Sequence, residues 1–414
     1  MVIFGKWRQK TMTLSIKPNS LTLGLQTGAT ALQAGGSQVM SFDGEGRLWT
    51  AMQEGISYRR GLNGRTVAKW QIVPGRSEER ERRWLTPSEA GELEEHARMT
   101  VFDLLSDLRS GDILLQSALP AEALPMLERA ASFTRDRYRA DTGQYHQVYM
   151  PVGILPPDQY MAVVLQATEG CSFNTCTFCN FYRDRRFRIR GTEEFRSHAL
   201  AVRDYLGAGL NLRRTIFLGD ANALVVPMPR LLGLMDVIHE VFDVEQLGGI
   251  YAFLDGFSGE KKTAADYAEL ARRGMKRIYI GMESGSEELL QFLNKPGKPE
   301  DVVQAVKAIK AGGVAVGIIV LLGAGGHFYS RIHVRDTIAA IRQMPLDMDD
   351  LIYFSELIEA EDLEYTRDAY DHSLKPLTPQ ERIAQGEAIE AALHFSEARG
   401  TPHISRYDIR EFVY

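Results

Sequence analysis

Long hydrophobic runs, an excess of charge of one sign, and cysteine are all scarce in this sequence of 414 residues. No segment reaches the roughly 18 consecutive apolar residues that indicate a membrane-spanning helix, and no apolar stretch follows the basic residues at the start as in a secretory signal. The 48 lysines and arginines stand against 54 acidic residues, a net charge of −6, so the whole chain has no electrostatic attraction to nucleic acid or anionic membrane. We therefore expect a cytoplasmic protein with neither a membrane nor nucleic acid as its partner.

The composition is that of a folded protein. Hydrophobic residues make up 44% of the chain, charged residues 25% and aromatic residues 9%, which excludes a mostly disordered or collagen-like chain. The length fits two domains, or one α/β barrel with additional segments.

The three cysteines fall within nine positions, as Cys171, Cys176 and Cys179. An odd number packed this closely is no disulfide framework, which leaves a metal site, a catalytic thiol or coincidence. Thiolates are soft ligands that suit iron–sulfur clusters or zinc, and three of them leave one position for an external ligand. A zinc site would need a fourth ligand, and the nearest histidine after Cys179 is His198. We favour a metal site.

The first part of the chain has the pattern of an antiparallel sheet followed by helices. Between residues 39 and 71, short β-prone runs are separated by glycine-containing turns, which is typical of hairpins. Helices are expected over 88–109 and 121–139.

The second part alternates strands and helices. Six strands are expected, over residues 162–168, 215–219, 249–253, 277–281, 314–322 and 351–355. Such alternation predicts a parallel sheet. No Gly-x-Gly-x-x-Gly motif follows the first strand, which disfavours a dinucleotide fold, and six units are fewer than the eight of a closed barrel.

These patterns predict an α/β protein whose core is a partial (β/α)6 TIM-like barrel, preceded by a β-meander and a helical region. We expect three domains: residues 1–150 (meander and helices), 151–360 (barrel core) and 361–414 (a helical extension that packs on the barrel). Chemistry is expected at the carboxyl ends of the strands, where the cysteine loop lies.

The cysteine loop resembles the cluster loop of the radical S-adenosylmethionine (SAM) superfamily. The spacing Cys171-x4-Cys176-x2-Cys179, with Phe178 before the last cysteine, looks like a branch related to the oxygen-independent coproporphyrinogen oxidase and elongator catalytic-subunit group. Further matching motifs are Phe217-Leu-Gly-Asp-Ala-Asn-Ala223, Ile280-Gly-Met-Glu-Ser-Gly-Ser286 with Lys295, and Val320-Leu-Leu-Gly-Ala-Gly-Gly326.

The resemblance implies the cofactors and their contacts. Cys171, Cys176 and Cys179 would each bind one iron of a 4Fe-4S cluster, and SAM would chelate the fourth iron. Phe178 would lie beside the adenine, unless it is a core aromatic residue.

Three loops at strand ends are implied as further SAM contacts. Gly219, Asp220 and Asn222 would hold the methionine ammonium, although Asp220 could instead cap a helix. Glu283 and Ser284 would reach the ribose hydroxyls or the methionine end, although Ser284 could cap the following helix. Gly323 would let the backbone approach the adenine, although a plain tight turn is the alternative.

The function implied is that of an enzyme that cleaves SAM reductively and carries out radical chemistry on a small molecule, with flavodoxin or ferredoxin as electron donor. Two alternatives remain: transfer of a 3-amino-3-carboxypropyl group from SAM, and a non-catalytic zinc-binding module. The sequence identifies neither the substrate nor a catalytic residue.

Overall fold

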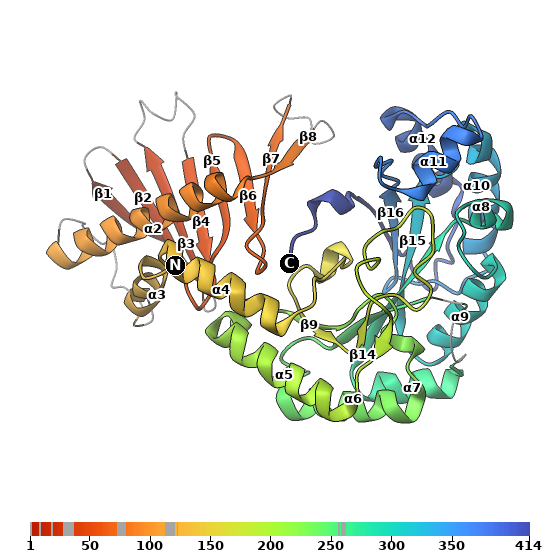
Figure 1. The fold of residues 1–414 in the computed structure, drawn as a ribbon, viewed down its shortest axis with the longest axis horizontal. Coiled ribbons are helices and arrows are strands. Elements are labelled where there is room, and N and C mark those ends of the chain that lie inside the picture. Colours follow the sequence, from red (N-terminus) through yellow and green to blue (C-terminus); the bar gives the residue numbers. More distant parts are fainter. Residues whose placement is uncertain are drawn as a thin grey trace. The chain divides into compact units, whose positions relative to one another are not determined.

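The computed structural model divides into two compact units (Figure 1). One unit contains residues 1–151, 201–214 and 413–414, and the other contains residues 152–200 and 215–412. The structure describes residues 2–7, 10–17, 20–27, 37–72, 80–111, 121, 123–255, 257 and 262–414. In this part of the chain, no helix combines the length and the apolar character needed to cross a membrane.

The first unit contains an antiparallel sheet of eight strands in chain order. The strands are β1 (Val2–Trp7), β2 (Lys10–Lys17), β3 (Ser20–Thr27), β4 (Ser37–Phe42), β5 (Leu48–Gln53), β6 (Ile56–Arg60), β7 (Thr66–Gln71) and β8 (Arg80–Trp84). The predicted meander is confirmed, but it begins earlier than expected. Gln53 pairs with Ile56 across a two-residue turn, and the positive φ values of Glu54 (50°) and Gly55 (79°) are those of a tight hairpin.

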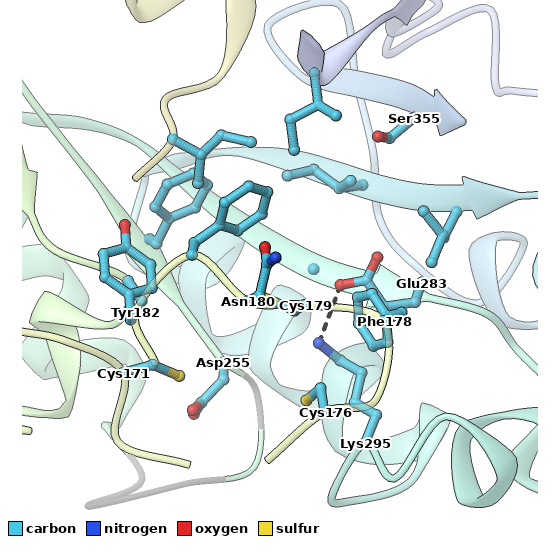
Figure 2. A pocket seen from close by; sticks show the side chains of 18 of the residues that line it. Cys171, Cys176, Phe178, Cys179, Asn180, Tyr182, Asp255, Glu283, Lys295 and Ser355 are labelled. Atoms are coloured by element: carbon cyan, nitrogen blue, oxygen red, sulfur yellow. Dashed lines mark hydrogen bonds and ion pairs between the residues drawn. The ribbon is translucent and has the colours of Figure 1, made fainter. Parts of the chain in front are cut away.

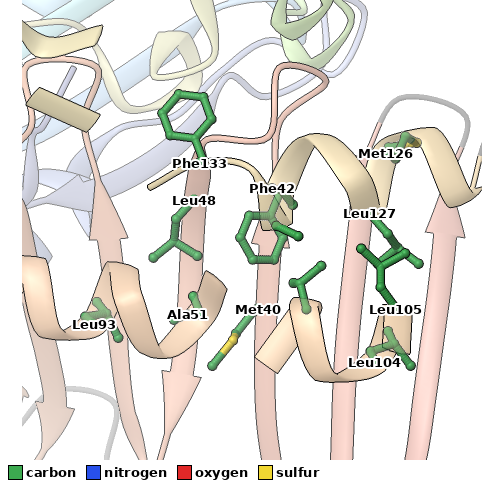
Figure 3. Packing of buried hydrophobic residues seen from close by; sticks show 14 of the residues in the cluster. Met40, Phe42, Leu48, Ala51, Leu93, Leu104, Leu105, Met126, Leu127 and Phe133 are labelled. Carbon is green, nitrogen blue, oxygen red and sulfur yellow. The ribbon is translucent and has the colours of Figure 1, made fainter. Parts of the chain in front are cut away.

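Three helices follow the sheet: α2 (Pro87–Ser110), α3 (Ala123–Ala131) and α4 (Arg135–Val148). The single helix expected over 121–139 is two helices, because the hydroxyl of Thr134 accepts from the Arg137 amide and begins a new one. Apolar residues of the strands, such as Met40 and Phe42, pack against Leu93 and Leu127 of the helices (Figure 3).

The second unit is built on a parallel sheet with the strand order β17-β16-β15-β14-β13-β12-β9. These strands are β9 (Ala162–Gln166), β12 (Thr215–Gly219), β13 (Ile250–Leu254), β14 (Met275–Glu283), β15 (Ala315–Leu322), β16 (Leu351–Glu356) and β17 (His403–Tyr407). The expected α/β class and its six strands are confirmed. The sheet has a seventh strand, β17, in a segment where we expected helices alone.

The helices of this unit are α5 (Thr192–Leu206), α6 (Met228–Val241), α7 (Ala264–Arg272), α8 (Glu287–Phe292), α9 (Pro299–Ala311), α10 (Gly326–Ile341), α11 (Glu364–Asp371) and α12 (Pro379–Ala392). Each strand lies beside the previous one in the chain, so right-handed crossovers bring the helices to the same face of the sheet. Helices α6, α7, α9 and α10 form an arc along that face (Figure 1). This is the winding of an open, partial barrel, with β9 and β17 as its edges.

Asp350 joins the starts of three strands. Its buried carboxylate accepts hydrogen bonds from the amides of Val316 (2.7 Å) and Asp347 (2.8 Å) and lies 2.8 Å from the ammonium of Lys310. Its carbonyl accepts from the amide of His403 at the start of β17. This residue therefore ties β17 to the rest of the sheet.

We expect Asp350→Ala to lower the free energy of unfolding by about 3 kcal/mol, because it leaves buried amides without an acceptor. The matched control is Asp349→Ala, since Asp349 is exposed and should change stability by less than about 0.5 kcal/mol. Equilibrium unfolding in urea measures both. Equal stability of the two variants would contradict the role of Asp350.

Candidate functional site

The cysteine loop is closed at its base by two short strands. β10 (Thr168–Glu169) pairs antiparallel with β11 (Arg188–Ile189), so that residues 170–187 form a loop directly after β9. Gly170 and Asn174 have φ values of 78° and 56°, and a glycine adopts this left-handed conformation without steric cost. The loop therefore turns sharply just before Cys171.

Asp220, which follows β12, holds the start of this loop. One carboxylate oxygen accepts from the Gln166 side chain (2.8 Å), and the other accepts from the Gly170 amide (2.9 Å). The second oxygen also lies 3.5 Å from the guanidinium of Arg185, on the returning arm of the loop. Burial raises the pKa of Asp220 to about 6. The residue thus connects two strand ends to both arms of the loop.

The three cysteine side chains line one cavity of about 370 Å³, together with Glu283 and Lys295 (Figure 2). Burial raises the pKa of the Cys176 thiol to about 12 and that of the Cys179 thiol to about 11. The ammonium of Lys295 acts against this effect at both cysteines, because a positive charge stabilises a thiolate.

Glu283 and Lys295 form a largely buried ion pair in the cavity wall, with 3.0 Å between Oε1 and Nζ. Glu283 ends β14 after a bulge and has a φ of 59°. A Cβ atom at Gly281 would lie 2.4 Å from the carboxylate oxygen and 3.4 Å from the ammonium nitrogen. The pair therefore occupies space that any residue other than glycine at position 281 would fill. Burial lowers the pKa of Lys295, but the charges of Glu283, Cys176 and Asp255 and the hydrogen bond to Glu283 together outweigh burial, so the pKa is raised.

Of the predicted SAM contacts, Phe178, Asn222 and Glu283 line the cavity with the cysteines. Phe178 also packs against a cluster of buried residues that includes Leu289 and Leu293, and its contact with adenine stays a prediction. The amide nitrogen of Asn222 donates to the Ser172 hydroxyl at 3.1 Å.

Gly219, Asp220, Ser284 and Gly323 are not among the residues that line this cavity in the described part of the chain. The Ser284 hydroxyl lies 2.8 Å from Nδ1 of the buried His333. Ser286, rather than Ser284, caps helix α8. Gly323 has a φ of 86°, and its amide donates to the Gln385 side chain.

Asp255, Ser355 and Tyr407 also line the cavity, and the sequence interpretation omitted them. Asp255 directly follows β13, and Ser355 lies near the end of β16. Asp255 and Ser355 could have been identified from the sequence by their positions at strand ends. Tyr407 could not be found in this way because β17 was not expected.

The donor chemistry fits an iron–sulfur cluster. Three thiols, the preferred ligands of such clusters, come from one loop onto one cavity wall. The ammonium of Lys295 would offset part of the negative charge that three thiolates bring. Within the residues that the structure describes, no three His, Cys, Asp or Glu side chains form a group that could hold a single metal ion.

The raised pKa of Asp220 gives a testable pH dependence. Between its ordinary value of 3.8 and about 6, the folded protein retains a proton that the unfolded chain has released. The free energy of unfolding should therefore fall as the pH rises from about 4 to 6, by at most about 3 kcal/mol from this residue. The fall should be absent from Asp220→Asn, and urea unfolding of both cluster-free proteins at several pH values measures the difference. Parallel profiles would contradict the assignment.

Residues 165–340 match the family model of the Radical SAM superfamily. No curated protein matches the chain. Among solved structures, the chain is similar to coproporphyrinogen III oxidase from Escherichia coli (14% identity, TM-score 0.39, 56% of this chain and 50% of that one). It is also similar to Elp3 from the archaeon Methanocaldococcus infernus (12%, 0.37, 59% and 56%) and to SuiB from Streptococcus suis (12%, 0.39, 86% and 72%).

The chain thus spans about half the length of the first two structures. Likeness of this degree is too low to carry a substrate or a reaction over to this chain. The family match covers the cysteine loop and strands β12 to β15. On this match, residues 165–340 form a radical SAM domain.

Proposed function

We propose that this enzyme binds a 4Fe-4S cluster through Cys171, Cys176 and Cys179 and uses it to cleave SAM and start radical chemistry on a small molecule. One observation carries the proposal: the three cysteines and Glu283 line the same cavity, at the carboxyl ends of the strands of the matched domain. When bound, the cluster supplies the electron that breaks the sulfonium bond of SAM.

The residues of the chain bind and orient the cofactors in this proposal. Each thiolate would hold one iron, which would leave one iron for the amino and carboxylate groups of SAM. Glu283 offers a carboxylate acceptor to a hydroxyl or ammonium group, and Lys295 fixes its orientation through the ion pair. Phe178 would present its ring to the adenine, and Asn222 lines the same cavity.

Asp220 has a different role in this proposal from the SAM contact implied by the sequence. Its carboxylate already accepts from Gly170 and Gln166, so we assign it to positioning the cysteine loop. The electron comes from a separate donor such as flavodoxin or ferredoxin. The relation to the coproporphyrinogen oxidase and elongator group rests on the sequence motifs and stays part of the proposal.

Two alternatives predict different observations. Cleavage at another carbon–sulfur bond would release a 3-amino-3-carboxypropyl group, and mass spectrometry of cleaved SAM distinguishes this from 5′-deoxyadenosine. A zinc-binding module would be colourless, with about one zinc per chain.

We expect Cys171→Ala, Cys176→Ala and Cys179→Ala each to prevent stable cluster binding, because a cluster held at two irons loses a protein anchor. Iron, acid-labile sulfide and SAM cleavage are measured after anaerobic reconstitution. Thr175→Ala is the matched control, since Thr175 is exposed, lies in the same loop outside the cavity lining, and carries no thiol. A cysteine variant with full iron content and normal cleavage would overturn the ligand assignment.

Glu283→Gln should weaken SAM binding about tenfold to a hundredfold, because a hydrogen bond to a charged group contributes about 1.5–3 kcal/mol. Cluster content should stay unchanged. Glu288→Gln is the matched control, since Glu288 is exposed and lies outside the cavity lining. Anaerobic calorimetric titration compares the two variants, and equal SAM affinity would assign Glu283 to structure alone.

A further inference from the structure

The side of the cavity away from the cysteines has an apolar wall. Figure 2 shows Ser355 across the cavity from Cys171 and Cys176. The wall on this side is formed by aliphatic side chains from β15 and from the segments after β16 and β17: Ile319, Leu321, Leu357, Ile358 and Ile409.

The hydroxyl groups of Ser355 and Tyr407 lie within this wall, at paired positions of neighbouring strands. Leu321 pairs with Ser355 between β15 and β16, and Ser355 pairs with Tyr407 between β16 and β17. All three line the cavity. Burial raises the pKa of Tyr407 to about 12, so both groups are neutral hydroxyls at physiological pH. They can donate or accept a hydrogen bond without adding charge.

The charged side chains that line the described part of the cavity are engaged with groups of the protein. Glu283 pairs with Lys295 at 3.0 Å, Glu356 with Arg382 at 2.9 Å, and Arg410 with Asp408 at 2.6 Å. The carboxylate of Asp255 accepts from the hydroxyl of Ser172 at 3.3 Å. Inside the cavity, a charged substrate would have to compete with the largely buried Glu283–Lys295 pair or lose its hydration against aliphatic carbon, and both are costly.

We propose that this part of the cavity binds an uncharged, largely apolar substrate whose single hydrogen-bonding group faces Ser355 and Tyr407. The inference rests on the proposed function, since it takes the cysteine side of the cavity as the place of the cluster and SAM. On this proposal, a molecule with several carboxylates would not be a substrate.

Three probes that share one ring system test the inference by equilibrium dialysis against the full chain, reconstituted anaerobically with SAM present. They are 2-naphthol (neutral, with one hydroxyl), 2-naphthoate (anionic) and naphthalene (no polar group). We expect 2-naphthol to bind at least tenfold more tightly than 2-naphthoate. Equal or tighter binding of 2-naphthoate, or no binding of 2-naphthol, overturns the proposal.

A charge placed in the apolar wall should reverse the preference. Ile358 is half-buried and lines the cavity, so Ile358→Arg should bind 2-naphthoate more tightly than 2-naphthol. The matched control is Met348→Arg, because Met348 is 71% exposed and lies outside the cavity lining. This control should keep the original order, and a reversal in the control as well overturns the proposal.

The hydroxyl pair is tested separately. Tyr407→Phe should weaken 2-naphthol about three- to tenfold, the contribution of one neutral hydrogen bond, and leave naphthalene unchanged. Equal losses for the two probes would make Tyr407 a packing residue and overturn its assigned role.

SAM cleavage by the same preparations separates the test of the substrate class from the test of the proposed function. Intact cleavage with the wrong probe order rejects the substrate class and leaves the proposed function standing. Absent cleavage with the expected probe order rejects the proposed function, and the substrate assignment that rests on it fails with it.

Discussion

The sequential winding of the parallel sheet is the constraint on which the second unit depends. Because each strand lies beside its predecessor, the right-handed crossovers bring the helices to one face of the sheet. Side chains that alternate toward the opposite face, such as Ile319 and Leu321 of β15, are left to line a cavity. The loops at the carboxyl ends of the strands then converge on this cavity, which is why a cysteine loop after β9 and a carboxylate after β14 meet there.

The cavity combines a polar and an apolar part, and burial disfavours unpaired charge in both. Near the cysteines, burial raises the pKa of the Cys176 and Cys179 thiols, and a buried ammonium acts against this effect. On the other side, buried aliphatic carbon disfavours any unpaired charge. The Glu283–Lys295 pair is compatible with both parts of the cavity, since it supplies two charged groups to the cavity wall and adds no net charge.

The sequence predicted the parts of the site that depend on composition and order. The clustering of Cys171, Cys176 and Cys179 and the alternation of strands with helices needed no coordinates. The direction of each side chain was harder to predict. Glu283 and Ser284 were both expected to contact SAM, but the φ of 59° at Glu283 departs from the extended chain, and the Ser284 hydroxyl lies beside the buried His333 rather than in the cavity lining. Asp220 lies in the expected loop, but its partners at Gly170 and Gln166 follow from tertiary contacts that no local pattern encodes.

The missing side chain at position 281 has a consequence for how this site could be altered. The ion pair and a Cβ atom at Gly281 cannot occupy the same space, so a single added methyl group would compete with the pair for its place in the cavity wall. The cysteine loop and the aliphatic wall lie on other elements and would keep their own contacts. A substitution at position 281 would therefore displace the ion pair by steric contact alone and leave the three cysteines in the chain unchanged.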